Sequence, residues 1–197
     1  MEFVNKKPII YVLSGKAHTG KNVAANLIKE IYGELNKKSI NLSYASYLKE
    51  YAKNILSWDG SEETKPREFL QQLGVDLIKK TIDSRFVINR LLQDIKIYSY
   101  FYDVITISDA RFIEEIEDVK NSFSKVISIR ITKKTDSTLT EAEKKHISET
   151  ALDNYHNYDY VVSNDGSLEE LKDRLIIIIE EVNNGNRNWR ACWQWKR

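Results

Sequence analysis

Two glycines and a lysine near the start of the chain have the spacing of an anion-binding loop. The segment VLSGKAHTGKN carries Gly15, Gly20 and Lys21 in the pattern G-x-x-x-x-G-K. Glycines let successive backbone N–H groups converge on one anion, and the N-terminus of a following helix adds about half a positive charge. A lysine at this place reaches the terminal phosphates of a nucleotide. The segment therefore predicts a nucleotide phosphate loop, with an ordinary strand-to-helix turn as the alternative.

The residue after the lysine departs from the usual pattern. Asn22 stands where Ser or Thr would offer a hydroxyl to Mg²⁺. Its amide oxygen is also a hard, neutral ligand, but the side chain is longer and is expected to act through water. The sequence therefore predicts weakened metal binding with retained nucleotide binding. We expect His18, inside the loop, to lie over the phosphates as a surface residue rather than to act as a general base.

The loop requires a strand before it and a helix after it, and the flanking sequence predicts both. The run PIIYVLS at 8–14 is apolar throughout, as in a parallel strand that is buried on both faces. After the loop, Val23, Leu27, Ile31 and Leu35 recur at helical spacing. We therefore expect the loop to join a buried strand to a helix.

Four more apolar runs predict strands, at residues 40–45, 102–110, 125–131 and 158–163. Helical patterns separate most of these runs, so the fold class is α/β, with three layers and a mainly parallel five-stranded sheet. Ligands of such sheets bind outside the carboxyl ends of the strands. The glycine loop and Asp109 both fall at such ends.

The chain between about 46 and 100 is mostly helical in pattern, with one break. In SWDGSEETKP, the Asp-Gly pair and Pro66 mark a turn and the start of a fresh helix. A further helix is expected after the last strand, because Ser167 lies three residues before Glu170 in the spacing of a capping box.

Composition bounds the function only loosely. The 197 residues fit one domain, and 30 Lys plus Arg against 29 Asp plus Glu leave a net charge of +1. Nucleic acid and acidic membranes are therefore not expected partners. The single cysteine, Cys192, forms no intramolecular disulfide. With no signal-peptide pattern and no run of about 20 apolar residues, we expect a cytoplasmic protein.

Four segments in order resemble the deoxynucleoside monophosphate kinases of the phage and bacterial type, within the P-loop kinase group. They are GKAHTGKNVAA, KPREFLQQLGVDLIKK, ISDARFIEEIEDVK and HISETALDNYHNYDYVVSNDGSLEEL, and they span roughly residues 8–180. The family often has Asp after the lysine, where this chain has Asn22. It has Thr where this chain has Val75, and often Pro-Asn where this chain has Ile113 and Glu114.

The resemblance implies a P-loop NTPase fold over residues 1–197, with a helical acceptor-binding insert at about 46–100 and a lid at about 132–152. It also implies transfer of the γ-phosphoryl group of ATP, with Mg²⁺, to a nucleoside monophosphate. The acceptor phosphate has a second pKa near 6 and is largely ionised at pH 7, so no strong general base is needed. Catalysis then consists of positioning the substrates and neutralising their charge.

The resemblance assigns the catalytic roles to three residues. Lys21 would hold the β- and γ-phosphates. Asp109 is placed like a Walker B acid that holds Mg²⁺ or its water, while the alternative is an N-cap for the helix that begins at RFIEE. Arg111 would clamp the acceptor phosphate with its guanidinium fork, or else be a surface arginine of that acid-rich helix. Asn22 and Asp109 are the expected metal ligands.

On the acceptor side, Arg67 follows Pro66 at a helix start, where a cation fits poorly unless an anion lies nearby. Gln71, Gln72 and Asp76 are candidates to read a base or sugar edge, and the sequence leaves open which of them point inward. Glu149, in the His-x-Ser-Glu motif, would contact the acceptor or anchor the lid. 

The expected lid cations are Arg130, Lys133, Lys134, Lys144 and Lys145, where other kinases place several arginines. Lysines neutralise charge without forking, so lower efficiency is expected. The alternative is a solvated, charged loop.

The segment SNDGSLEEL resembles the loop that packs around the donor adenine, or else is a tight turn before a capped helix. The full set of expected ATP-binding residues is Gly15, Lys16, Ala17, His18, Thr19, Gly20, Lys21, Asn22, Val23, Asn164 and Gly166. In the tail at 185–197, Trp189, Trp193 and Trp195 are expected to cover an apolar groove on the body or on a second subunit, which leaves a homodimer open.

Two other functions stay open from the sequence. One is a P-loop kinase of another small metabolite, similar to the dephospho-coenzyme A kinases, and a hydroxyl acceptor would then need a carboxylate base near Arg111. The other is a nucleotide-binding regulatory protein in which Asn22 and the lysine-rich lid have abolished turnover.

Overall fold

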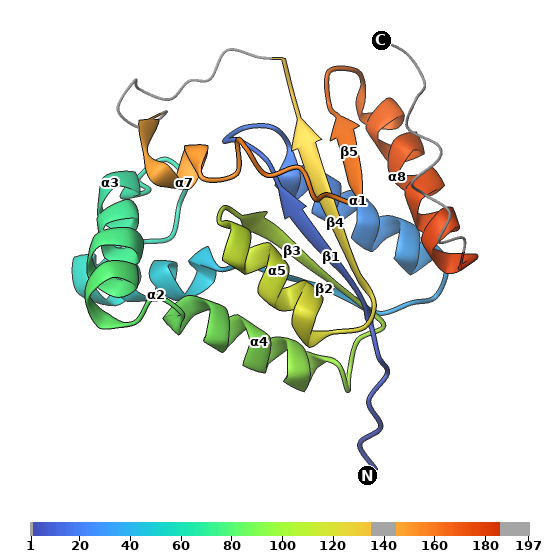
Figure 1. The fold of residues 1–197 in the computed structure, drawn as a ribbon, viewed down its shortest axis with the longest axis horizontal. Coiled ribbons are helices and arrows are strands. Elements are labelled where there is room, and N and C mark those ends of the chain that lie inside the picture. The colour runs from blue at the N-terminus through green and yellow to red at the C-terminus, as the bar shows by residue number, and fades with distance from the viewer. Residues whose placement is uncertain (1, 135–144, 186–197) are drawn as a thin grey trace.

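The computed structural model describes residues 2–134 and 145–185 (Figure 1). Residues 135–144 of the expected lid, including Lys144, and residues 186–197 of the tryptophan-rich tail lie outside these ranges. Within the described residues, no helix combines the length and the apolar character needed to cross a membrane.

The described strands form a single five-stranded sheet in the order β2-β3-β1-β4-β5, with β1 at its centre. Every neighbouring pair is parallel. The strands are β1 (Ile9–Ser14), β2 (Ser39–Leu42), β3 (Val104–Ala110), β4 (Val126–Thr132) and β5 (Tyr160–Ser163). All five lie within a few residues of the predicted runs, so the expected parallel sheet is confirmed.

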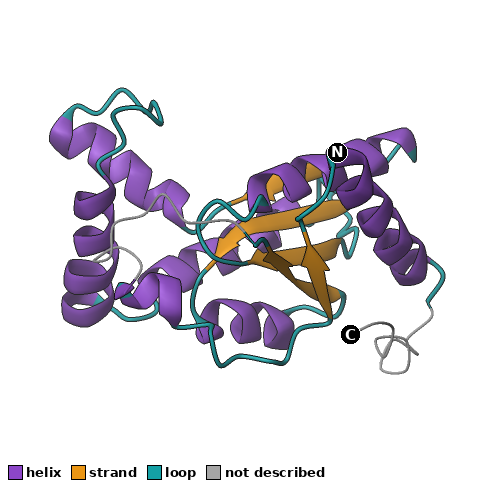
Figure 2. Ribbon diagram, turned by 90° about the horizontal axis from the view of Figure 1, so that it is seen from above, coloured by secondary structure: helices purple, strands orange, loops and turns teal. Residues whose placement is uncertain are grey.

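Helices connect consecutive strands and cover both faces of the sheet, as Figure 2 shows from above. Their bounds are α1 (Lys21–Glu34), α2 (Ala45–Leu56), α3 (Arg67–Gln71), η1 (Gln72–Ile82), α4 (Phe86–Tyr98), α5 (Ile113–Ser122), α7 (Ile147–Thr150) and α8 (Leu168–Asn183). The predicted cap of α8 is present, because the Ser167 hydroxyl accepts a hydrogen bond from the backbone N–H of Glu170 at 3.2 Å.

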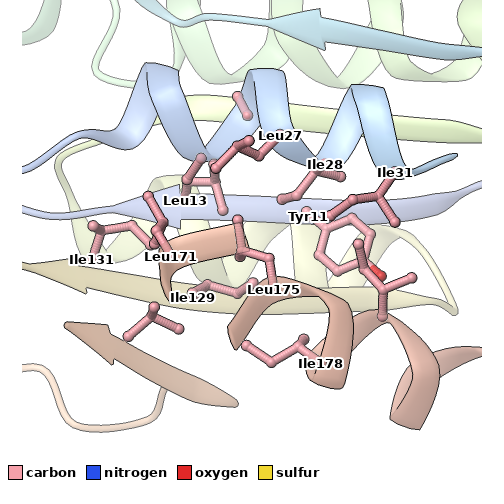
Figure 3. Close-up of a cluster of buried hydrophobic side chains, with 14 of the residues drawn as sticks. Tyr11, Leu13, Leu27, Ile28, Ile31, Ile129, Ile131, Leu171, Leu175 and Ile178 are labelled. Carbon is pink, nitrogen blue, oxygen red and sulfur yellow. The ribbon is translucent and has the colours of Figure 1, made fainter. Parts of the chain in front are cut away.

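Alternation along the central strand builds two cores. Tyr11 and Leu13 of β1 face α1 and α8, where they pack with Leu27, Ile28 and other buried residues (Figure 3). Ile10 and Val12 face the other way. That second core includes buried residues of α4 and α5. Because β1 is covered on both faces, the loop after it leaves the sheet from a rigid base.

In the predicted helical insert, α2, α3 and η1 lie to one side of the sheet, and α4 returns from them to pack on the sheet in the second core (Figure 1). One of its helices is unusual. Over 11 residues η1 has the i→i+5 hydrogen bonding of a π-helix, which is rare and widens the helix relative to an α-helix. Pro66 precedes the first residue of α3, as the sequence predicted.

Candidate active site

A cavity of about 560 Å³ extends from the glycine loop to the helical insert. Its wall includes His18, Lys21 and Asn22 on the loop side. On the insert side it includes Arg67 and Gln71. The cavity therefore brings together two groups of predicted site residues that lie more than forty positions apart in the sequence.

The loop depends on its two glycines. Gly15 has φ +147°, and a Cβ atom on it would lie 2.3 Å from the carbonyl oxygen of Ile131. Gly20 has φ +95°, and a Cβ atom there would lie 2.3 Å from the side-chain amide of Asn164. Any other residue at either position would meet both backbone strain and a clash. The loop conformation is therefore specific to this glycine spacing.

Lys21 is the first residue of α1, and its ammonium group returns to the loop. Its Nζ donates to the carbonyl oxygens of Gly15 at 2.8 Å and Lys16 at 2.7 Å. Burial, and then the nearby Arg111 guanidinium, lower the pKa of Lys21 from 10.5 to about 8. An ammonium has three hydrogens, so two are used within the loop and one is left for an anion.

The other loop residues either line the cavity or support the loop from within. Ala17, Asn22 and Val23 line the cavity with His18, which has a left-handed backbone at φ +62°. Thr19 is instead buried, and its hydroxyl donates to the Lys16 carbonyl at 2.9 Å.

The expected adenine loop contributes support rather than wall. The Asn164 side chain donates to the Thr19 carbonyl at 3.0 Å and so holds the phosphate loop. The cavity wall does not include Asn164 or Gly166. Within the described residues, this segment therefore supports the phosphate loop on the side away from the cavity.

Asp109 lies at the end of β3 and is engaged by the start of α2. It accepts hydrogen bonds from the Ser43 hydroxyl at 2.6 Å, and from the backbone N–H groups of Tyr44 at 2.8 Å and Ala45 at 2.9 Å. The alternative in which Asp109 caps α5 is wrong. The N–H groups of Arg111 and Phe112, just before α5, donate instead to the carboxylate of Glu115, which lies in the first turn of that helix.

Glu115 is a buried acid in the wall of the cavity. Its carboxylate accepts from the N–H groups of Arg111 at 2.6 Å and Phe112 at 3.1 Å. Burial, and to a lesser extent the nearby Asp109 charge, raise the pKa of Glu115 from 4.5 to about 8, although those two hydrogen bonds act in the opposite direction. Glu115 thereby fixes the backbone from which the Arg111 side chain projects.

The Arg111 side chain pairs with the buried carboxylate of Glu149. Nη1 of Arg111 donates to Oε1 of Glu149, while Oε2 of Glu149 accepts from the backbone N–H of Ala17 at 3.0 Å. One carboxylate thus connects the predicted acceptor clamp to the phosphate loop. Both Arg111 and Glu149 line the cavity.

The acceptor candidates of the insert separate by orientation. Arg67 and Gln71 line the cavity. Gln72 and Asp76 do not, because their side chains bond to Glu68 and Lys80 on the exposed side of the helices, at 3.1 and 2.7 Å. The structure therefore brings Arg67 and Gln71 to the site and leaves Gln72 and Asp76 away from it.

The described lid cations also lie away from the cavity wall. Arg130 donates to the Leu152 carbonyl at 2.7 Å and lies 3.7 Å from Asp153, so it anchors the segment after α7. Lys133, Lys134 and Lys145 are exposed.

Several wall residues were not identified from the sequence. The cationic ones are Lys49, Lys65 and Lys79, and the aliphatic ones are Leu48, Leu70, Val75, Ile78, Val87 and Ile88. Lys65 adjoins the Pro-Arg motif, so its position was a usable signal. The aliphatic residues resemble ordinary core positions, and only the tertiary arrangement shows that they face a cavity.

A metal site made by the protein alone is absent from the described residues, which contain no cluster of three or more His, Cys, Asp or Glu side chains suited to an ion. Asp109 already accepts three hydrogen bonds. A carboxylate offers about four lone-pair directions, so Asp109 fits one metal-bound water better than a direct ionic contact. Asn22 lines the cavity and offers an amide oxygen.

Comparison with known proteins assigns the chain to a family. The family model described as deoxynucleotide monophosphate kinase matches residues 33–175. The chain belongs to this family. A protein of Acanthamoeba polyphaga mimivirus, whose name assigns it provisionally to the deoxynucleotide monophosphate kinases, is 24% identical over 205 residues, covering 90% of this chain and 99% of that protein. The resemblance noted in the sequence is therefore confirmed at the level of the family.

Solved structures show the same fold at low identity. The APS kinase of Mycobacterium tuberculosis, in complex with AMPPNP and APS, matches with a TM-score of 0.53 at 13% identity, over 88% of this chain and 98% of that one. A sugar kinase from Janibacter sp. HTCC2649 matches with a TM-score of 0.54 at 11% identity, over 88% and 95%. These likenesses show the P-loop α/β fold, and together with the family they support a phosphotransferase.

Proposed function

We propose that the protein transfers the γ-phosphoryl group of ATP to the phosphate of a deoxynucleoside monophosphate. The observation that carries the proposal is that one cavity contains both the phosphate loop with Lys21 and the insert residues Arg67 and Gln71. Donor and acceptor can therefore bind in one cavity. The family to which the chain belongs supports the same acceptor class.

The cations of the wall suit a reaction between two anions. Lys21 would contact the terminal phosphates of ATP through its remaining hydrogen. Arg111 would hold the acceptor phosphate, because a guanidinium matches two phosphate oxygens at once. Arg67 would neutralise the acceptor from the insert side. Phosphoryl transfer requires positioning and charge neutralisation more than covalent help from the protein.

The carboxylates of the site favour a phosphate acceptor over a hydroxyl acceptor. A hydroxyl nucleophile would need a base near Arg111, and the nearby acids are Asp109, Glu115 and Glu149. Burial raises the pKa of Glu115 to about 8, so that carboxyl is largely protonated at pH 7. This leaves Asp109 and Glu149 as candidates. Asp109 accepts three hydrogen bonds, and Glu149 is paired with Arg111 and with the Ala17 N–H. Neither is a free base in this arrangement, whereas a phosphate acceptor is ionised already.

Mg²⁺ would accompany ATP and would supply positive charge against the charge that develops during transfer. On the protein side, Asn22 and Asp109 would hold it through water. With both contacts indirect, the phosphates of the nucleotide would supply most of the metal affinity.

The proposal is tested by measuring ADP formation from ATP and Mg²⁺ with each deoxy- and ribonucleoside monophosphate. We expect turnover with at least one deoxynucleoside monophosphate and no comparable ADP formation when the acceptor is omitted. Tight ATP binding with no ADP formation across this panel would contradict the proposal and support a regulatory nucleotide-binding protein.

A further inference from the structure

Glu149 accepts hydrogen bonds from two donors, Arg111 and the Ala17 N–H, that the two substrates of the proposed reaction would also need. Its side chain is 5% exposed. One oxygen takes the Arg111 guanidinium and the other takes the Ala17 N–H at 3.0 Å. A backbone N–H of a phosphate loop and a forked arginine are both groups that bind phosphate in nucleotide sites.

Whether Glu149 keeps this position depends on the charges around it, and therefore on whether substrate phosphates are bound. The Glu149 carboxylate neutralises Arg111 and accepts a hydrogen bond from the half-buried N–H of Ala17 in the loop. When a triphosphate and a monophosphate enter the same cavity, Glu149 becomes a further anion among several. Like charges at close range disfavour that arrangement, so the carboxylate and the phosphates compete for the same donors.

Arg111 is arranged so that this exchange can occur. Its side chain remains 35% exposed while the Glu149 side chain is nearly buried, so an incoming phosphate has access to the guanidinium. Arginine offers five N–H donors. Rotation of the Glu149 side chain would be enough to release both partners.

Resting on the proposed function, we propose that Glu149 is an internal stand-in for substrate phosphate that couples the donor and acceptor sites. The acceptor phosphate displaces Glu149 from Arg111, and the loss of that partner frees the Ala17 N–H for the donor. Each substrate therefore helps the other to bind. Glu149 is a positioning residue in this scheme and takes no part in bond making.

A purely structural role for Glu149 makes a different prediction, and the chain offers a control. The segment after α7 is tied to the body by other contacts, because Asp153 pairs with Lys16 at 3.1 Å and Arg130 donates to the Leu152 carbonyl at 2.7 Å. Asp153→Asn weakens the charge pairs with Lys16 and Arg130, and Asp153 has no contact with Arg111 among the described contacts. Glu50→Gln makes the same chemical change as Glu149→Gln on an exposed residue of α2 that pairs only with Lys53 among the described contacts.

The test is calorimetric titration of AMPPNP, with and without each of dAMP, dCMP, dGMP and dTMP at saturation, in the wild-type protein and the three variants. The wild-type Kd for AMPPNP should fall about fivefold when the preferred monophosphate is present, within the usual range of coupling between sites. In Glu149→Gln the AMPPNP Kd should already be low without monophosphate, and the coupling should shrink toward onefold. Asp153→Asn and Glu50→Gln should keep the wild-type coupling.

Weaker AMPPNP binding in Glu149→Gln, or coupling equal to that of the wild type, would overturn the inference and identify Glu149 as a fixed brace. If Glu149→Gln does not fold, the wild-type measurement still decides, because absence of coupling there contradicts the scheme. Failure of wild-type protein to bind AMPPNP at all would refute the donor site of the proposed function itself, and the inference with it.

Discussion

The two ends of the cavity are built in different ways. At the loop end the polar groups are already paired within the chain: Lys21 with loop carbonyls, Asp109 with the start of α2, and Glu149 with Arg111. At the insert end much of the wall is aliphatic, and its cations pair with exposed acids: among the described contacts, Lys65 and Arg67 pair with Glu62 at 2.9 and 3.9 Å, and Lys79 pairs with Glu114 at 3.2 Å.

The difference indicates how each end would select its ligand. Donors that are held in fixed positions recognise the charge of a phosphate and lose that recognition when they are displaced. An aliphatic wall recognises shape, with Gln71 as a polar contact in that wall. Substitutions at the loop end should therefore affect every acceptor alike, while those at the insert end should affect acceptors selectively.

Lys21→Ala should have the largest effect. Removal of the loop ammonium should reduce turnover by about a thousandfold or more with every acceptor, by analogy with other cations that neutralise the charge of the transition state in phosphoryl transfer. The matched control is Lys16→Ala, which removes an exposed loop lysine that pairs with Asp153 and should reduce turnover far less. Steady-state ADP formation measures both, and equal activity of the Lys21 variant would refute the mechanism.

Arg111→Ala should chiefly raise the acceptor KM, by about 30- to 100-fold, because a charge-assisted contact to phosphate is lost. The acceptor KM of Arg111→Lys should lie between those of the wild type and Arg111→Ala, since an ammonium keeps the charge but cannot bind two phosphate oxygens as a guanidinium does. The KM for ATP should change much less. An equal rise of both KM values would show that Arg111 acts on the donor as much as on the acceptor, and would contradict its assignment as the acceptor clamp.

The affinity for AMPPNP should depend on pH at the loop end. The pKa of Lys21 is about 8 in the free protein, lowered first by burial and then by Arg111. A bound triphosphate favours the ammonium form, so binding above pH 8 must take up a proton. The Kd should be flat from pH 7.2 to about 7.5 and rise about tenfold per pH unit above 8. Titrations from pH 7.2 to 9.5 measure this, and in Arg111→Ala the rise should begin at higher pH.

Gly74→Ala should have the smallest effect and should act at the insert end alone. A Cβ atom at Gly74 would lie 2.8 Å from Cδ1 of Leu48, and both residues line the cavity. Leu48 must shift, so the acceptor KM should rise about fivefold with an unchanged Kd for AMPPNP. The control is Gly33→Ala, where a Cβ atom meets nothing within 4 Å. A larger effect on AMPPNP than on the acceptor would contradict the division between the two ends.

Much of the fold was predictable because its signals are local. Continuous apolar runs mark strands buried on both faces, and the two glycines of the loop require a backbone that other residues cannot adopt. The start of α3 after Pro66 and the cap of α8 follow from residues that are neighbours in sequence. The π-helical form of η1 was not predictable, since its residue pattern is also compatible with an α-helix.

The site was predictable in its residue types and less so in its pairings. Asp109 binds the start of α2, more than sixty positions earlier, and Glu149 reaches back to Ala17. Such contacts depend on how the elements pack, which spacing along the chain does not encode. For the same reason the sequence left open which of Gln71, Gln72 and Asp76 face the cavity.

The attachment of Asp109 to α2 affects how experiments on metal dependence should be designed. Leu48 and Lys49 stand on that helix and shape the acceptor side of the cavity. Replacing Asp109 would release the helix start as well as any ion, so lost activity would combine two causes. Exchanging Mg²⁺ for Mn²⁺ or Ca²⁺ in the intact protein changes the ion alone, and it is therefore the cleaner way to learn what the metal contributes.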